Sequence, residues 1–101
     1  MPSIKLVWKP VAKASFEEIK ARAMSAGRFT EFTLAHNEIV LTLRDSQSAF
    51  VAGEQLYRTQ KEGGEVRLFV HEMIAVCYAI FRNESTGLIL KYLVSPDGWP
   101  D

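Results

Sequence analysis

Apolar and polar residues alternate along three short segments in the first half of the chain, which predicts strands with one buried face. The first segment, residues 3–9, ends at Pro10, which has no N–H to donate to a neighbouring strand. Residues 28–35 and 38–44 form the other two, and the second of these has the cleanest alternation in the chain. Asn37 lies between them and tolerates positive φ, so we expect a tight hairpin there.

Helical spacing of apolar residues marks two further segments. Residues 15–26 carry an apolar stripe, and Ser15 with Glu18 has the spacing of a capping box, which satisfies otherwise unpaired backbone N–H groups. A glycine follows this segment and can close the helix in the left-handed conformation. Residues 46–62 predict a second helix that a pair of glycines ends. Gly53 is unfavourable inside a helix, and a close approach of this helix to the sheet would explain it.

The last third of the chain is rich in β-branched and aromatic residues, which favours strands. Residues 65–70 alternate, with two valines and a leucine expected to face inward. Residues 73–82 and 88–94 are apolar on both faces, and residues 83–87 have turn chemistry. No Gly or Pro interrupts residues 65–82, so three structures are open for them. The segment could form two strands, one long bent strand, or a strand followed by a buried helix.

The order of these elements, β-α-β-β-α-β with further C-terminal strands, predicts a single α+β domain over residues 1–101. It matches the connectivity of ferredoxin-like folds. We therefore expect an antiparallel sheet of five to six strands with two helices on one face, which leaves the other face open.

The open face of the predicted sheet is expected to be apolar. The side chains assigned to it are Val7, Val40, Phe69, Ala75, Cys77, Ala79, Phe81, Ile89 and Leu93. A monomer rarely exposes so large a continuous apolar patch, so we expect a second copy of the chain to cover it. The predicted interface residues are Val40, Phe69, Cys77, Phe81, Ile89, Leu93 and, from the C-terminal tail, Trp99. The alternative is that the C-terminal strands curl over and close the core within one chain.

Charge and cysteine content narrow the classes of partner. Lysine plus arginine number 12, and so do aspartate plus glutamate, so the net charge gives no reason to expect a nucleic acid or an anionic membrane. The longest strongly apolar stretch, residues 73–81, is too short to span a bilayer as a helix. The chain has a single cysteine, and its first residues lack the apolar core of a signal peptide. These features predict a cytoplasmic protein.

His71 is the foremost candidate for a catalytic residue. Its neighbour Glu72 would point to the opposite side of a strand, so the two side chains are not expected to touch. Tyr57 and Arg58 lie together on the predicted second helix, where they could bind an anion and share an active site with His71. No segment carries a catalytic signature, so an enzyme is the less favoured class.

No metal site or cofactor is predicted. His36, in the expected hairpin turn, and His71 lie far apart in sequence and lack the spacing of zinc ligands. Cys77 lies in the most apolar segment and is expected to be an unreactive core residue. A pocket between helices and sheet would have aromatic walls. The ligand-binding residues predicted for it are Trp8, Phe32, Tyr57 and Tyr78.

Together these observations favour a small homodimeric binding protein that holds an apolar ligand or a protein partner on its open sheet face or in a pocket. A cofactor-independent enzyme of the dimeric α+β barrel type, with His71, Tyr57 and Arg58 at its pocket, is the first alternative. An accessory protein such as an immunity factor or an antitoxin is the second.

Overall fold

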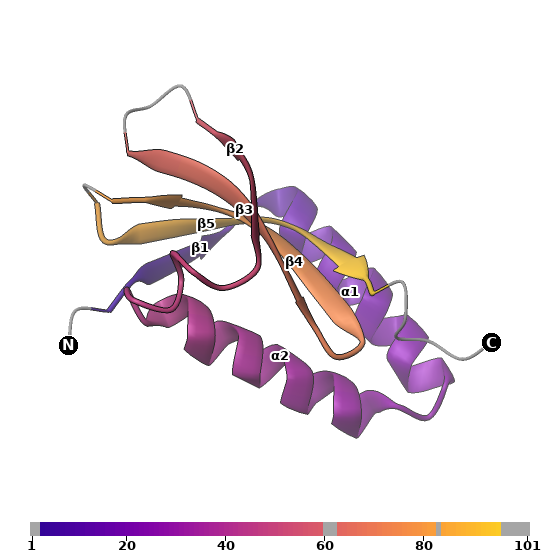
Figure 1. The fold of residues 1–101 in the computed structure, drawn as a ribbon. Coiled ribbons are helices and arrows are strands. Elements are labelled where there is room, and N and C mark those ends of the chain that lie inside the picture. Colours follow the sequence, from indigo (N-terminus) through magenta and orange to yellow (C-terminus); the bar gives the residue numbers. More distant parts are fainter. Residues whose placement is uncertain (1–2, 60–62, 83, 96–101) are drawn as a thin grey trace.

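Two helices and a five-stranded sheet make up residues 3–59, 63–82 and 84–95, which are the residues described in a computed structural model (Figure 1). The elements are, in chain order, β1 (Lys5–Trp8), α1 (Pro10–Ser25), α2 (Phe29–Arg44), β2 (Glu54–Arg58), β3 (Gly64–His71), β4 (Ile74–Phe81) and β5 (Thr86–Val94). The strand order is β1-β5-β4-β3-β2. β1 is parallel to β5, and the other neighbouring strands are antiparallel.

The predicted α+β class with two helices on one face of the sheet is confirmed, but the ferredoxin-like connectivity is wrong. Both helices follow β1 directly, and the remaining four strands come after them. The sheet is also mixed rather than antiparallel throughout, because β1 and β5 are parallel neighbours. Both helices pack on the same side of the sheet (Figure 1). The hydrophobic core therefore lies between the helices and one sheet face, and the opposite face carries neither helix.

The helix α2 replaces the two strands and the hairpin that the alternation predicted over residues 28–44. Its buried side chains are Phe32, Ala35, Ile39 and Leu43, which form one stripe at helical spacing. Leu41, which a strand would bury beside Ile39 and Leu43, is 67% exposed. Residues 28–35 contain no strand face that is apolar throughout, whereas the helix gathers Phe32 and Ala35 on the core side. The helical period therefore gives the larger buried surface.

The helix α1 begins at Pro10, five residues before the predicted start. Proline suits the first turn of a helix, where its missing N–H would have no helical partner. Ser15 consequently lies inside the helix and does not cap it. Its Oγ donates to the carbonyl of Ala12 at 3.0 Å and accepts the backbone N–H of Tyr92 at 2.9 Å, which ties α1 to β5. The glycine after the helix, Gly27, has the expected left-handed φ of 71°.

The second helix predicted over residues 46–62 is wrong. Residues 45–53 form a series of turns, and β2 follows them. Asp45 stabilises the first turn, since its carboxylate accepts the Ser48 hydroxyl at 2.6 Å and the backbone N–H of Gln47. These hydrogen bonds, with that of Ser48 the stronger, lower the pKa of Asp45. Local hydrogen bonding of Asp and Ser side chains competes with helix formation in this way.

Gly53 does approach the sheet closely, as predicted, although it is in a turn. Its φ is 66°, and a Cβ at this position would overlap the backbone carbonyl of Leu68. The guanidinium of Arg67 donates hydrogen bonds to the carbonyls of Ala52 and Gly53 in this turn, at 3.0 Å each. The hydroxyl of Tyr78 lies 2.8 Å from another carbonyl of this segment, that of Ala49. The turn region is therefore fixed to the core side of the sheet.

Residues 65–82 are two strands, the first of the three structures left open. β3 and β4 pair from Gly64 opposite Phe81 to His71 opposite Ile74, and a turn at Glu72 joins them. Glu72 has a positive φ of 56°, which makes it the one non-glycine residue with positive φ among those described. The pairing of β4 with β5 shifts by one residue between Cys77 and Tyr78, which marks a bulge in the sheet.

Candidate functional site

The sheet face opposite the helices is apolar. Residues that pair across neighbouring strands share a face, so the register assigns alternate residues to this side. Its apolar residues, here called the open sheet face, are Val7, Val66, Leu68, Val70, Ala75, Cys77, Ala79, Phe81, Leu88 and Leu93. Val7, Val70 and Leu93 remain accessible, at 39%, 48% and 37% exposure. Val66, Ala75 and Ala79 are covered by their neighbours and are buried.

Three of the predicted interface residues lie on the open sheet face and three do not. Cys77, Phe81 and Leu93 are placed there by the register. Phe69 and Ile89 pair with core residues and face the helices. Val40 belongs to α2 because its segment is helical. Trp99 lies outside the described residues.

The register of β3 explains why Phe69 was misplaced. The alternation predicted Val66, Leu68 and Val70 to face the core, but these residues pair with Ala79, Cys77 and Ala75 on the open sheet face. The polar residues of β3, Glu65 and Arg67, face the core side instead, each 8% exposed. They can do so because they bind each other and the 45–53 turns, with Arg67 Nη1 3.0 Å from Glu65 Oε1. When paired charges are buried in this way, the polar face of a strand can pack against the core, and the alternation pattern then assigns the two faces the wrong way round.

Cys77 occupies the centre of the open sheet face. It lies on β4, the middle strand of the sheet, and is the single cysteine of the chain. Its row across the sheet contains Lys91 on β5 on one side, and Leu68 on β3 and Glu54 on β2 on the other. Partial burial raises the pKa of the Cys77 thiol, and the positive charge of Lys91 opposes this effect. We expected Cys77 to be buried in the core, but it is half-buried on the opposite face of the sheet.

On the helical side, three side chains distant in sequence form a hydrogen-bonded chain. Trp8 Nε1 donates to the hydroxyl oxygen of Tyr92 at 2.8 Å, and the same hydroxyl lies 2.8 Å from Nε2 of His36. Because an indole N–H can only donate, the hydroxyl oxygen accepts there, and it can donate its own proton to His36 in the tautomer that leaves Nε2 unprotonated. Burial lowers the pKa of His36 and raises that of Tyr92, which keeps both groups neutral near pH 7.

Aromatic rings surround this hydrogen-bonded chain. The ring of His36 lies 4.6 Å from that of Phe16 and 5.5 Å from that of Tyr92, measured between centroids. Phe32, a predicted ligand-binding residue, is buried behind them with its ring stacked on His36 at 6.4 Å. Aromatic pairs at these distances are stabilising. The position of His36 is therefore fixed by packing as well as by its hydrogen bond.

Trp8 and His36 both line two hollows on the surface. One has a volume of about 300 Å³ and is lined by Trp8, Lys13, Phe16, Glu17 and His36. The other, of about 500 Å³, is lined by Trp8, His36, Asn37, Val40, Leu41 and Arg44. Of the predicted ligand-binding residues, Trp8 alone lines them. Tyr78 lies in the core, where burial raises its pKa to about 12, and Tyr57 is 59% exposed on β2 at the sheet edge.

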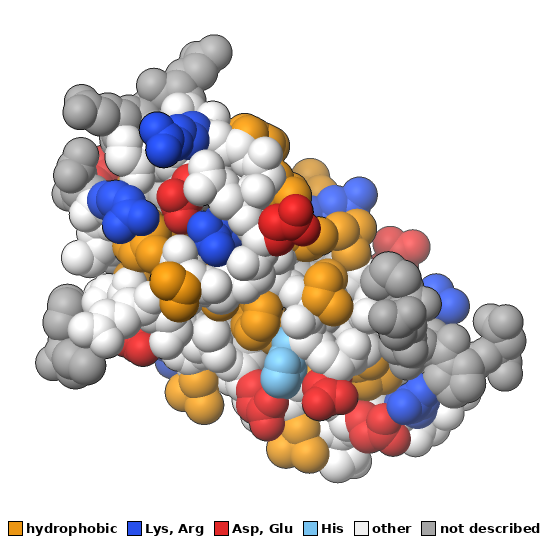
Figure 2. All heavy atoms as spheres, in the orientation of Figure 1, with side chains coloured by type: hydrophobic (Ala, Val, Ile, Leu, Met, Phe, Trp, Pro, Cys, Tyr) orange, Lys and Arg blue, Asp and Glu red, His pale blue; other side chains and the backbone are white. Residues whose placement is uncertain are grey.

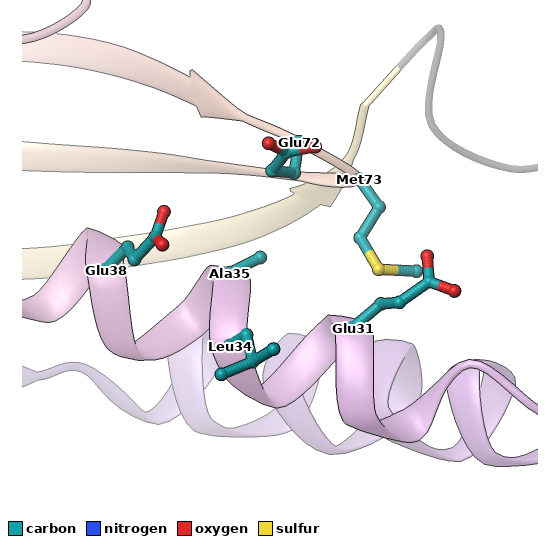
Figure 3. A pocket seen from close by; sticks show the side chains of 6 residues that line it. All are labelled: Glu31, Leu34, Ala35, Glu38, Glu72 and Met73. Carbon is teal, nitrogen blue, oxygen red and sulfur yellow. The ribbon is translucent and has the colours of Figure 1, made fainter.

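His71 contacts a carboxylate, but one that the sequence did not identify as its partner. Its Nε2 contacts Glu38 of α2, whereas Glu72 belongs to the turn. Glu38 also lines a hollow of about 240 Å³. Figure 3 shows the side chains that line it, between α2 and the β3–β4 turn. Its lining residues are Glu31, Leu34, Ala35, Glu38, Glu72 and Met73. Acidic side chains gather over α2 on this side of the molecule (Figure 2).

The structure does not bring together the residues proposed for an active site. Tyr57 and Arg58 lie on β2 opposite Val66 and Glu65 of β3, and His71 is the last residue of β3. At about 3.3 Å per residue, they are some 15 Å or more from it. Within residues 3–59, 63–82 and 84–95, no three metal-ligating side chains cluster.

Neither of the two described helices is both long and apolar enough to cross a membrane. Comparison with known proteins gives no match for this chain, whether with family models, with curated proteins or with solved structures.

Proposed function

We propose that this protein is a homodimeric binding protein whose two copies associate through the open sheet face. The observation that carries the proposal is the group of apolar side chains on the side of the sheet opposite the helices, which Lys91 interrupts beside Cys77. No element of the described chain covers it. Soluble monomers rarely expose a continuous apolar patch of more than a few hundred Å².

The size of the open sheet face suits a dimer. Strands lie about 4.8 Å apart and rise about 3.3 Å per residue, so a five-stranded sheet with eight-residue central strands offers about 500–600 Å². Side-chain relief adds to this flat area. Stable interfaces bury about 600–1,000 Å² on each partner. One copy of the sheet therefore supplies an area at the lower end of this range.

Symmetry and charge also favour a second copy. A two-fold axis through the centre of the face packs β4 against β4 and places the two Cys77 residues near the axis. If the axis runs along β4, the β2 side of one copy lies over the β5 side of the other. Glu54 then lies close to Lys91 of the second copy, since both belong to the row of Cys77. Opposite charges would thus meet in the central row of an otherwise apolar interface.

The oligomeric mass tests this proposal. Sedimentation equilibrium should give about twice the chain mass of 11.4 kDa at micromolar concentration. Val70→Lys places a charge on the open sheet face and should yield a folded monomer. Val11→Lys is the matched control, because Val11 is 60% exposed on α1, away from the face, and should leave the dimer intact. A wild-type protein that stays monomeric up to about 100 µM contradicts the proposal.

The alternatives have less support from the geometry. For an enzyme, the proposed catalytic residues lie too far apart, since Tyr57 and Arg58 are near one end of β3 and His71 is at the other. No feature of the fold bears on an immunity or antitoxin role. A cytoplasmic location stays a prediction from the sequence.

A further inference from the structure

We propose that the groove beside Trp8 and His36, on the helical side of the molecule, binds a small aromatic carboxylate. The groove consists of the two hollows, of about 300 and 500 Å³, that Trp8 and His36 both line. Volumes of about 300–1,000 Å³ are typical of small-molecule sites. Three features of the groove specify the chemistry of its ligand, namely aromatic walls, a free ring N–H and unpaired cations.

Aromatic rings form the walls of the smaller hollow. Trp8, Phe16 and His36 line it, and the ring of Phe16 is held 4.6 Å from that of His36. The indole N–H of Trp8 is already bound to the Tyr92 hydroxyl, so Trp8 offers a ligand its ring and no polar group. Such walls favour a flat aromatic ligand that can pack against ring faces or edges.

His36 supplies a hydrogen-bond donor. We assign the tautomer in which Nε2 accepts the proton of Tyr92, and the neutral ring then carries its own proton on Nδ1. Nδ1 has no hydrogen-bond partner among the described residues, and none of their buried side-chain nitrogens or oxygens lacks a partner. Solvent therefore reaches Nδ1. The side chain of His36 lines both hollows, so in this tautomer we expect its N–H to reach an acceptor on a bound ligand.

The charges of the groove select an anion. Lys13 lines one hollow and Arg44 the other, and neither forms an ion pair with any residue in the described ranges. Glu17 is the one acidic side chain among the lining residues, so the groove has a positive balance. A carboxylate attached to the aromatic ring would meet the His36 N–H and one of these cations. Over the two hollows an aromatic amine would meet two like charges and one opposite charge, that of Glu17.

A charge series of one ring system tests the proposal. Trp99→Phe leaves Trp8 as the sole tryptophan, whose fluorescence then reports binding in the groove. We expect 1-naphthoate to change this fluorescence saturably, with 1-naphthylmethanol binding about tenfold more weakly and 1-naphthylmethylamine more weakly still. Backbone amide shifts in NMR should change around Lys13, His36 and Arg44.

Two variants separate the role of charge from that of shape. Lys13→Gln and Arg44→Gln should each weaken naphthoate binding about threefold, and the double variant about tenfold, without affecting the neutral alcohol. Lys91→Gln, on the other side of the sheet, should leave binding unchanged. Equal affinity for the three compounds, no saturable binding at millimolar concentration, or shifts confined to the open sheet face would each overturn the proposal.

This inference does not depend on the proposed dimer, because the groove and the open sheet face lie on opposite sides of the sheet. Sedimentation of the same samples distinguishes the two failures. A monomer that binds naphthoate contradicts the dimer alone, and a dimer that does not bind it contradicts the groove alone.

Discussion

Arg67 donates a hydrogen bond from Nη2 to the carbonyl oxygen of Gly53 at 3.0 Å and thereby attaches the turn before β2 to the core side of the sheet. The same guanidinium binds the Ala52 carbonyl and the carboxylate of Glu65. The acceptors of these three hydrogen bonds all belong to the protein. We interpret this buried arginine as a structural residue and expect its loss to affect stability.

Replacement of Arg67 by methionine should lower the free energy of unfolding by about 3–5 kcal/mol. The change leaves the buried carboxylate of Glu65 and the Gly53 carbonyl without the Arg67 donor, whereas the Ala52 carbonyl keeps the Tyr78 hydroxyl at 3.0 Å. Urea denaturation followed by circular dichroism measures the loss. Arg58→Met, at an exposed position of β2, is the control and should change stability by less than about 0.5 kcal/mol. A small effect of Arg67→Met would show that the 45–53 turns hold their position without it.

Two glycines with positive φ should respond differently to alanine. Gly27→Ala should cost about 1–2 kcal/mol, because φ is 71° but no atom lies within 4 Å of the added Cβ. Gly53→Ala should cost several kcal/mol, since its Cβ would overlap the Leu68 carbonyl in addition to a φ of 66°. Thermal unfolding of the two variants compares them directly. Equal losses would mean that the turn can move away from β3.

Stability should fall as the pH drops below about 6.5, the usual pKa of histidine. Burial lowers the pKa of His36 in the folded protein, so the unfolded chain binds a proton at a pH where the folded protein does not. The stabilising contribution is therefore complete above pH 6.5 and is lost as the pH falls toward the lowered value. Urea unfolding between pH 7.5 and 5 measures this slope, which His36→Gln should reduce. An NMR titration that finds His36 with a pKa above 6.5 would contradict the mechanism.

Removal of one hydroxyl should loosen the Trp8 groove. Tyr92→Phe deprives Trp8 Nε1 of its acceptor and His36 Nε2 of its hydrogen-bond partner, and it should lower stability by about 1–3 kcal/mol. Tyr57→Phe, on an exposed part of β2, is the matched control and should have almost no effect. Chemical denaturation and the emission maximum of Trp8 in a Trp99→Phe background are the measurements.

The single thiol should report on the dimer. Burial raises the pKa of Cys77, so its reaction with a disulfide reagent at pH 8 should be slower than that of an unfolded control. Since Cys77 lies at the centre of the open sheet face, the rate should fall further as rising protein concentration favours the dimer. In the Val70→Lys variant the rate should not depend on concentration. A wild-type rate that is equally constant would place the interface elsewhere.

The sequence by itself determined the elements whose local signals agree with their place in the fold. Segment 3–9 alternates and contains a strand as predicted, and segments 73–82 and 88–94 contain strands as their β-branched and aromatic residues favoured. The left-handed Gly27 and the close approach of Gly53 were also predictable, since both positions need a residue without a side chain. The apolar character of the open sheet face followed from strands that are hydrophobic on both sides.

Only the tertiary structure decided the features in which two local interpretations compete. Residues 28–44 carry both a helical and an alternating pattern, and the helix prevails because the sheet accepts its continuous stripe of Phe32, Ala35, Ile39 and Leu43. Which face of β3 packs against the helices depends on whether Glu65 and Arg67 can form hydrogen bonds in the core. The alternation of residues along the strand does not reveal this. The Trp8 groove needs side chains from β1, α2 and β5, where Trp8 and Tyr92 lie 84 residues apart in sequence. Local periodicity reports which side of an element is buried, whereas such distant contacts exist only once the elements have packed together.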